Sequence, residues 1–149
     1  MAKKFNFKLE SVLKYRADKV NQATESLNQI VKIRNEKEQE IQQNEEKKQV
    51  LFGTQKGKIK AADLQNKNNH INFLNDEIER LNEEKKQVLE IENLRRKKLT
   101  SAMKDEKVID KLKDKQKLAH DQNQKKEEGA FLDEIGLQIT MKNRDKHNG

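Results

Sequence analysis

The residues of this chain that come closest to a chemical motif are two glycines and the lysine that follows them. Gly53 and Gly57 are separated by three residues, and Lys58 comes next. A phosphate-binding loop needs four residues between its glycines, a serine or threonine after the lysine, and a strand before the first glycine. Here Ile59 follows the lysine, and a helical pattern precedes Gly53. The spacing argues against a nucleotide site and favours a turn.

Histidine and cysteine side chains are the usual metal ligands and catalytic groups, and their distribution here supports neither role. His70, His120 and His147 lie far apart and have no companion at metal-ligand spacing. We expect His120 and His147 to be exposed or to lie at the edge of a helix contact. The chain contains no cysteine, and no serine or histidine arrangement indicates a nucleophile. The sequence therefore predicts no catalytic, metal or cofactor site and no enzymatic activity.

One compact basic run, Arg95-Arg96-Lys97-Lys98, is the strongest candidate for nucleic-acid binding. The net charge of +7 suits a nucleic acid, an anionic membrane surface or an acidic protein. Acidic residues flank the run on both sides, however, and aromatic residues, which stack on bases, make up only 4% of the chain. The two signs of charge are interleaved, as on the solvated face of a coiled coil. We therefore expect no nucleic-acid partner. A helix pair that binds RNA or DNA is kept as an alternative, ranked behind the two hypotheses given below.

Long helices must carry these residues, because the chain contains almost nothing that stops a helix. Its 149 residues include no proline and only five glycines, and proline costs about 3 kcal/mol inside a helix. Apolar residues make up 32% and charged residues 40% of the chain, against about 45–50% and about 25% in ordinary globular domains. This composition buries a narrow seam rather than a thick core. The predicted fold class is all-α, a long antiparallel two-helix coiled-coil hairpin whose second helix is longer and overhangs the N-terminus.

The first arm carries a continuous stripe at alternating steps of four and three residues. This spacing meets a partner helix every 3.5 residues. Eight of its thirteen positions are apolar and cluster at the two ends, so we expect the polar stretch from Arg34 to Lys48 to be the loosest part. The stripe comprises Leu9, Leu13, Arg16, Val20, Ala23, Leu27, Ile30, Arg34, Lys37, Ile41, Asn44, Lys48 and Leu51.

The second arm carries a stronger stripe, which loses its apolar character once. The strict register lands on Glu92 and Arg95, whereas Ile91 and Leu94 offer a competing stripe shifted by one position. We expect a local stammer there, or a change in which face of the helix is covered. The apolar stripe comprises Ile71, Leu74, Ile78, Leu81 and Val88, with Lys85 among them, and recovers at Leu99, Ala102 and Ile109.

We expect residues 1–149 to form one coiled-coil unit with its turn at 53–57. The first arm spans about 5–52 and the second about 58–140. Folding at the turn pairs the first arm with residues near 58–105, so that about 106–140 project beyond the N-terminus. The sequence does not decide whether the tail 141–149 is ordered.

The densest apolar cluster near either end of the chain consists of Phe5, Phe7, Leu9, Val12 and Leu13. One interpretation is that this end of the first arm packs on the second arm. The other is an aromatic tip inserted into another protein, since buried aromatic residues tend to carry interface energy. The residues alone leave both open.

Three motifs stand in order along the chain: Phe7-x-Leu9-x-x-Val12-Leu13-x-x-Arg16, His70-Ile71-x-x-Leu74-x-x-x-Ile78, and Glu128-x-x-x-Leu132-Asp133-Glu134. Together they resemble the FliJ family, the small coiled-coil component of the bacterial flagellar export apparatus. An aromatic residue is more usual in the family where His70 stands. Gly129 and Gly136 replace more helix-favouring residues near the third motif, which puts the continuity of the helix there in question.

The resemblance implies a non-enzymatic stalk that is similar to the central stalk of rotary ATPases. The terminal end of such a stalk enters the flagellar export ATPase hexamer and promotes its assembly and activity. Family members also bind the export gate membrane protein and export chaperones. Carried over to this chain, the resemblance places the ATPase-facing end at Phe7, Leu9, Leu13, Arg16, Leu132, Asp133 and Glu134.

The resemblance places the export-gate face at His70, Leu74 and Leu81, with no cofactor implied. These residues lie at i, i+4 and i+11, roughly on one helical face. The alternative is that Leu74 and Leu81 are seam residues that never leave the hairpin. The stripe supports both interpretations equally.

Two further alternatives stay open: a generic coiled-coil scaffold, which would self-associate, and an injectisome stalk. A stalk hairpin should be mainly monomeric on its own. The N-terminus begins with lysines but reaches no apolar signal-peptide core, and the apolar runs are far shorter than the roughly 20 residues that span a bilayer. We therefore expect a cytoplasmic protein, peripheral to the cytoplasmic membrane at the flagellar base.

Overall fold

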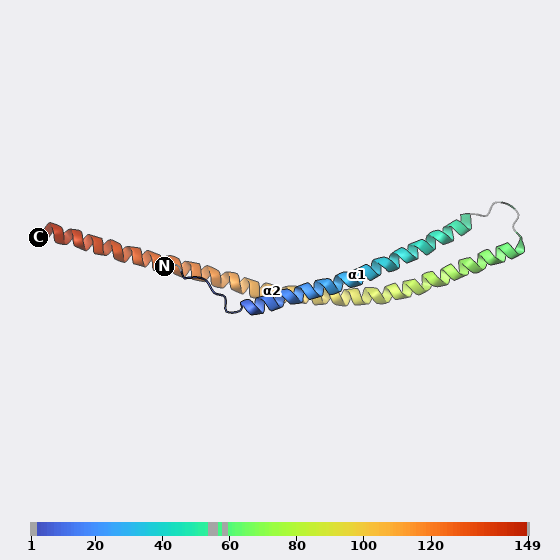
Figure 1. The fold of residues 1–149 in the computed structure, drawn as a ribbon, viewed down its shortest axis with the longest axis horizontal. Helices are drawn as coiled ribbons and strands as arrows, with labels where there is room; N and C mark the ends of the chain where they lie inside the picture. The colour runs from blue at the N-terminus through green and yellow to red at the C-terminus, as the bar shows by residue number, and fades with distance from the viewer. Residues whose placement is uncertain (1–2, 54–56, 58–59, 149) are drawn as a thin grey trace. The chain divides into compact units, whose positions relative to one another are not determined.

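Two long α-helices account for almost all of the structure. The computed structural model describes residues 3–53, 57 and 60–148. Helix α1 spans Glu10–Gly53 (44 residues) and helix α2 spans Ala61–Asn148 (88 residues), and the described residues contain no strand (Figure 1). No proline interrupts either helix. The predicted all-α fold, with two long packed helices of which the second is longer, is confirmed.

The chain divides into two compact units. Unit 1 comprises residues 1–17 and 104–149, and unit 2 comprises residues 18–103. The single coiled-coil unit expected for residues 1–149 stays a prediction.

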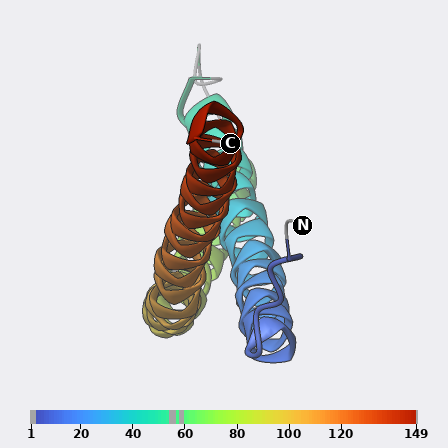
Figure 2. The ribbon, with the colours of Figure 1, turned by 90° about the vertical axis from the view of Figure 1, so that its left-hand side faces the viewer.

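In unit 2, α1 and α2 pack against each other in opposite directions (Figures 1 and 2). Arg95 Nη1 donates a hydrogen bond of 2.7 Å to the carbonyl oxygen of Ser26, and Lys37 Nζ lies 2.7 Å from Glu84 Oε2. Residue numbers rise along α1 as those of their partners fall along α2, which is antiparallel pairing. The apolar core of the seam consists of Leu27, Ile30, Leu74, Ile78 and Leu81.

The heptad stripe of the first arm is confirmed in unit 2. Each of its positions from Val20 to Leu51 is buried or half-buried, including the polar stretch that begins at Arg34. Stripe positions face the partner helix because successive steps of three and four residues return to the same side of an α-helix.

The register of α2 continues unbroken through its charged positions. Glu92 is only 4% exposed, whereas Ile91 is 40% and Leu94 62% exposed. The expected stammer, or change of covered face, is therefore wrong. Ion pairs allow the charged side chain of Glu92 to be buried in the seam. Glu92 Oε2 lies 3.0 Å from Arg34 Nε on the other helix, and Glu92 Oε1 accepts a 3.0 Å hydrogen bond from Arg96 Nη2.

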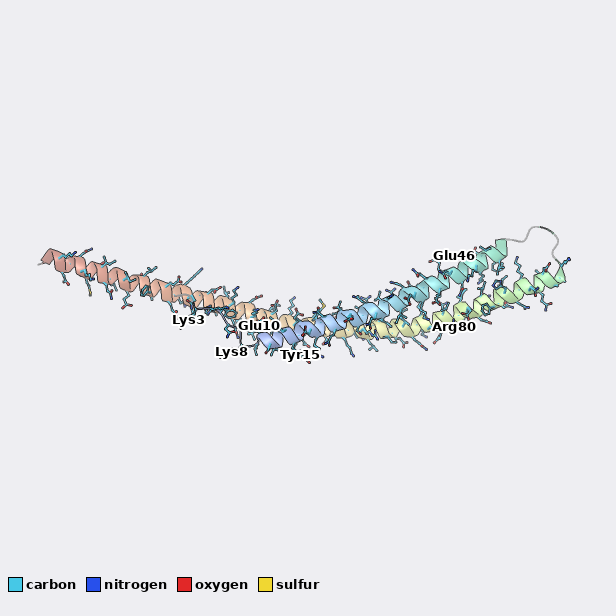
Figure 3. The ribbon with its side chains drawn as sticks, in the orientation of Figure 1. Lys3, Lys8, Glu10, Tyr15, Glu46 and Arg80 are labelled. Atoms are coloured by element: carbon cyan, nitrogen blue, oxygen red, sulfur yellow. The ribbon has the colours of Figure 1, made fainter. Side chains whose placement is uncertain are left out.

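Unit 1 combines the beginning of α1 with the C-terminal part of α2. Residues 3–7 have no regular secondary structure, and α1 begins at Glu10, later than the expected arm at about residue 5. Arg16 Nη1 lies 2.9 Å from Asp105 Oδ2, and Lys113 Nζ lies 2.9 Å from Glu10 Oε2. Figure 3 labels Glu10 at the start of the helix. Pairing along α2 thus extends well beyond residue 105.

The overhang of α2 begins later than the sequence suggested. The N-terminal segment reaches His120, whose Nε2 donates a 2.8 Å hydrogen bond to the carbonyl oxygen of Lys3. Beyond His120, the described residues from Asp121 to Lys146 are exposed, except for half-buried Gln124, Gly129 and Ile135. The expected overhang of about 106–140 is corrected to 121–148. The reason is the register of the helices, because Lys37 pairs with Glu84 and Glu10 pairs with Lys113, further along α2 than the expected pairing with residues 58–105 allows.

Two features mark the connection between the helices. Gly57 has a φ of 106°, in the left-handed region that glycine adopts without strain. The remaining part of the expected turn, residues 54–56, lies outside the described residues, as does Lys58. At the start of α2, the N–H of Leu64 donates to the carbonyl oxygen of Lys60, and Asp63 places a negative charge in the first turn, where it stabilises the helix dipole.

Neither described helix combines the length and the apolar content that a membrane crossing requires.

Candidate functional site

The four N-terminal residues predicted to face an ATPase ring lie in unit 1, and three of them are buried or half-buried. Phe7 is 5% exposed, and Leu13 and Arg16 are half-buried. Leu9 is the exception, at the boundary of exposure with 36%. The burial of Phe7 agrees with the first interpretation of the N-terminal cluster, in which it packs on the second arm.

Short contacts hold this N-terminal segment in place. The N–H of Glu10 donates a 3.2 Å hydrogen bond to the carbonyl oxygen of Phe7, which closes a turn before α1. The rings of Phe5 and His120 have centroids 5.5 Å apart and are tilted by 50°, within the range of favourable aromatic contacts. His120 therefore lies at the edge of a contact. This is one of the two positions expected for it, the other being full exposure.

The three C-terminal residues predicted for the same interface lie on the overhang and are exposed. Leu132 is 66% exposed, and Asp133 and Glu134 follow it. The helix continues through Gly129 and Gly136, so its continuity at the third motif is settled for the described residues. One face of this helix is apolar, with residues at i, i+1, i+4 and i+8: Phe131, Leu132, Ile135 and Ile139.

The residues predicted to contact an export gate lie in unit 2 and differ in exposure. His70 is exposed, on a surface that also includes Val50 and Leu51. Leu74 and Leu81 are buried in the seam, and Leu81 is the most buried side chain of the described residues. As the hairpin stands, these two leucines offer no surface to a partner, and a gate contact through them stays a prediction that requires the helices to separate.

A charged network of partly exposed side chains flanks the seam beside these leucines. Glu84 accepts hydrogen bonds of 2.7 Å from Lys37 on α1 and from Arg80 on α2, and Arg80 also binds Glu77 at 2.7 Å. Figure 3 labels Arg80 on α2. The hydrogen bond from Lys37 holds the pKa of the Glu84 carboxyl below its ordinary value. The same bond raises the pKa of Lys37. The beginning of the polar stretch of α1, at Arg34, Lys37 and Glu38, is therefore tied to α2 by charge pairs.

The motifs that resembled chemical sites are spread over the fold. Gly53 is the last residue of α1, so a helix stands where a phosphate-binding loop needs a strand. The side chain of His147 lies outside the described ones. Among the described residues, no group of histidines and carboxylates comes together as a metal site.

Comparison with known families decides what kind of protein carries this geometry. The family model described as flagellar FliJ protein matches residues 5–145, nearly the whole chain. This chain belongs to the FliJ family. Comparison with curated proteins and with solved structures gave no significant match. Family membership makes this FliJ-family chain a component of the flagellar export apparatus, in a family whose members are non-catalytic.

Reasoning from the sequence missed the most unusual feature of this FliJ-family chain, a buried carboxylate in place of an apolar seam residue. The available signal was charge complementarity. Arg34 and Glu92 both occupy strict stripe positions and carry opposite charges, so an ion pair across the seam satisfies both. Ile91 and Leu94, which form the competing apolar stripe, are turned outward.

Proposed function

We propose that this FliJ-family chain is the stalk of the flagellar export ATPase and carries out no chemistry of its own. Its terminal end, formed by the N-terminal segment and the overhang of α2, enters the ATPase hexamer. All seven residues predicted for that interface belong to unit 1. The contact promotes assembly and activity of the ring.

The unpaired overhang is the observation that carries this proposal. The last part of helix α2, from Asp121 to Asn148, has almost every described side chain exposed. A helix without a partner is only marginally stable in water, and most helical stability in proteins comes from packing an apolar face. The apolar face at Phe131, Leu132, Ile135 and Ile139 therefore needs a partner, and the pore of a ring supplies one.

The mechanism is a shift of population. A stalk that binds the assembled hexamer more tightly than free subunits stabilises the hexamer by mass action. If it also binds the active arrangement of subunits more tightly than the inactive one, it raises the active fraction by the ratio of the two affinities. Neither effect needs a catalytic group on the stalk.

Contacts with the export gate and with export chaperones complete the proposed role and place the protein beside the membrane at the flagellar base. Of the predicted gate residues, His70 is the one with an exposed side chain. A gate contact that leaves the hairpin intact therefore centres on His70. Replacing His70 and Glu77 with alanine is expected to weaken binding to the gate without loss of helicity. If binding and helicity were both lost, the weaker binding would reflect unfolding, and the assignment of His70 to the gate contact would fail.

The stalk role is tested by ATP hydrolysis of the cognate export ATPase, with hexamer formation followed in parallel. We expect the chain to stimulate both. Leu132→Gln should reduce the stimulation, because it removes an exposed apolar contact without disturbing the seam. The matched control is Leu137→Gln, which changes another leucine of the overhang that is 65% exposed and lies outside the apolar face. Truncation after Lys126 should abolish the stimulation.

Three results would count against the stalk role: no stimulation, stimulation that survives truncation after Lys126, or no co-elution with the ATPase. Sedimentation at several concentrations would then test the scaffold hypothesis, because a scaffold gains mass with concentration and a stalk hairpin stays mainly monomeric.

A further inference from the structure

The flank of the hairpin in unit 2 carries a groove whose charged lining residues are all positive, here called the basic groove. One part is lined by α2 alone, and a second part, which shares Arg95 and Lys98 with the first, is lined by both helices. These lining residues include four cations and no carboxylate. The chain as a whole has 33 basic and 26 acidic residues, with the two signs interleaved. The lining comprises Lys19, Gln22, Ala23, Ser26, Ile91, Leu94, Arg95, Lys97, Lys98, Ser101 and Ala102.

Two exposed apolar side chains form one edge of the basic groove. Ile91 and Leu94 point outward because the register of α2 buries Glu92 between them. The ion pair between Glu92 and Arg34 fixes that rotation of the helix. Ile91, Leu94 and Lys98 follow one another at steps of three and four residues, so that they share one helical face.

Short side chains line the centre of the part of the groove that lies between the helices. Ala23, Ser26 and Ala102 leave a depression, and Arg95 crosses it to donate a hydrogen bond to the carbonyl oxygen of Ser26. A guanidinium has five N–H donors in a planar fork. One hydrogen bond fixes its position, and its other donors can bind an incoming carboxylate in bidentate fashion.

We infer that the basic groove binds an acidic amphipathic α-helix of a partner protein. A groove between two packed helices accepts the ridge of a third helix. The apolar edge at Ile91 and Leu94 takes apolar residues of that helix, and the surrounding cations take its aspartates and glutamates. The partner is thus defined by an apolar stripe with acidic flanks.

Other occupants match this surface less well. A single-stranded nucleic acid gains affinity from stacking on aromatic side chains, and no aromatic residue is among those that line the groove. A second copy of the chain in a symmetric contact would bring the same cations face to face, which is unfavourable. The inference stands apart from the proposed stalk role, because none of its residues belongs to the predicted ring or gate interfaces.

The test measures the fluorescence anisotropy of a labelled model peptide on titration with the full-length chain. The peptide has about 20 residues, long enough to form a helix, with leucines along one face and glutamates on both flanks. We expect saturable binding that weakens as salt is raised. Leu94→Gln, and separately the double variant Lys97→Glu/Lys98→Glu, should each weaken binding about tenfold, as expected for contacts that anchor an interface.

Matched controls separate the groove from the general charge of the protein. Leu118→Gln removes a leucine of α2 that is also exposed, and Lys115→Glu/Lys117→Glu makes the same change in net charge at exposed positions. Both should bind the peptide within about twofold of the unchanged chain. Circular dichroism confirms that each variant keeps its helicity.

Several outcomes would overturn the inference. One is equal binding of a peptide in which lysines replace the glutamates, and another is unchanged binding by Leu94→Gln. A third is single-stranded RNA that binds through Lys97 and Lys98 while the peptide does not bind. The last is a dimer of the chain that Leu94→Gln dissociates, which would assign the surface to self-association.

Discussion

The substitution Leu81→Ala tests whether the seam holds the hairpin of unit 2 together. Leu81 is 1% exposed and occupies a strict stripe position between Ile78 and Lys85. Truncating a buried leucine to alanine costs about 2–5 kcal/mol, from lost transfer free energy and the cavity left behind. A seam with only one neighbouring helix can close in on the gap, so we expect about 2–3 kcal/mol, in the lower part of that range.

The assay is urea denaturation followed by far-ultraviolet circular dichroism. A loss of about 2–3 kcal/mol lowers the urea midpoint by roughly 1–2 M for a small protein. The matched control is Leu94→Ala, which makes the same chemical change in the same helix at a side chain that is 62% exposed. It should alter stability by less than about 0.5 kcal/mol.

Equal midpoints for the two variants would refute the reasoning, because burial of Leu81 would then contribute nothing to stability. A large loss in both variants would show that the register buries Leu94 as well. Either result would reopen the choice between the two stripes of α2.

Three further predictions concern polar contacts. Glu92→Gln should lower the free energy of unfolding by about 1–3 kcal/mol, because it removes the charge that Arg34 faces in the seam. Urea midpoints should fall as the pH drops below the ordinary pKa of a glutamate, because protonation of Glu84 ends its bond to Lys37, and also as the pH rises above the ordinary pKa of a lysine, because Lys37 then loses its proton. His120→Ala should speed tryptic cleavage near the N-terminus, because the segment before α1 loses a hydrogen bond and a ring contact.

Each of these predictions has its own control. Glu90→Gln changes an exposed neighbour and should leave the urea midpoint unchanged; an equal loss would show that Glu92 has no special role. The signs of the pH effects follow from a lowered pKa for Glu84 and a raised one for Lys37, so a Lys37→Met/Glu84→Gln variant with the same pH profile would contradict them. Gln122→Ala, at an exposed position just past His120, should leave cleavage rates as they are.

The sequence by itself determined the helices and the faces that meet. The absence of proline, together with Gly53 and Gly57 as the two glycines that lie close together before the last quarter of the chain, predicted two long helices with a connection between them. The stripe from Val20 to Leu51 identified the covered side of α1, because the period of an α-helix converts spacing directly into direction. The same local patterns identified the FliJ family through its three motifs.

Only the tertiary structure decided the pairing register and the burial of Glu92. The register is set by contacts across the two helices, such as Lys37 with Glu84 and Glu10 with Lys113, and it places the start of the overhang at 121 rather than about 106. Whether a charged residue is buried depends on the residue that faces it, which lies 58 positions away in the case of Arg34 and Glu92. Hydrophobicity along one helix favours Ile91 and Leu94, but an ion pair across two helices can hold the other face inward. That contact is non-local, and it leaves the apolar pair on the surface.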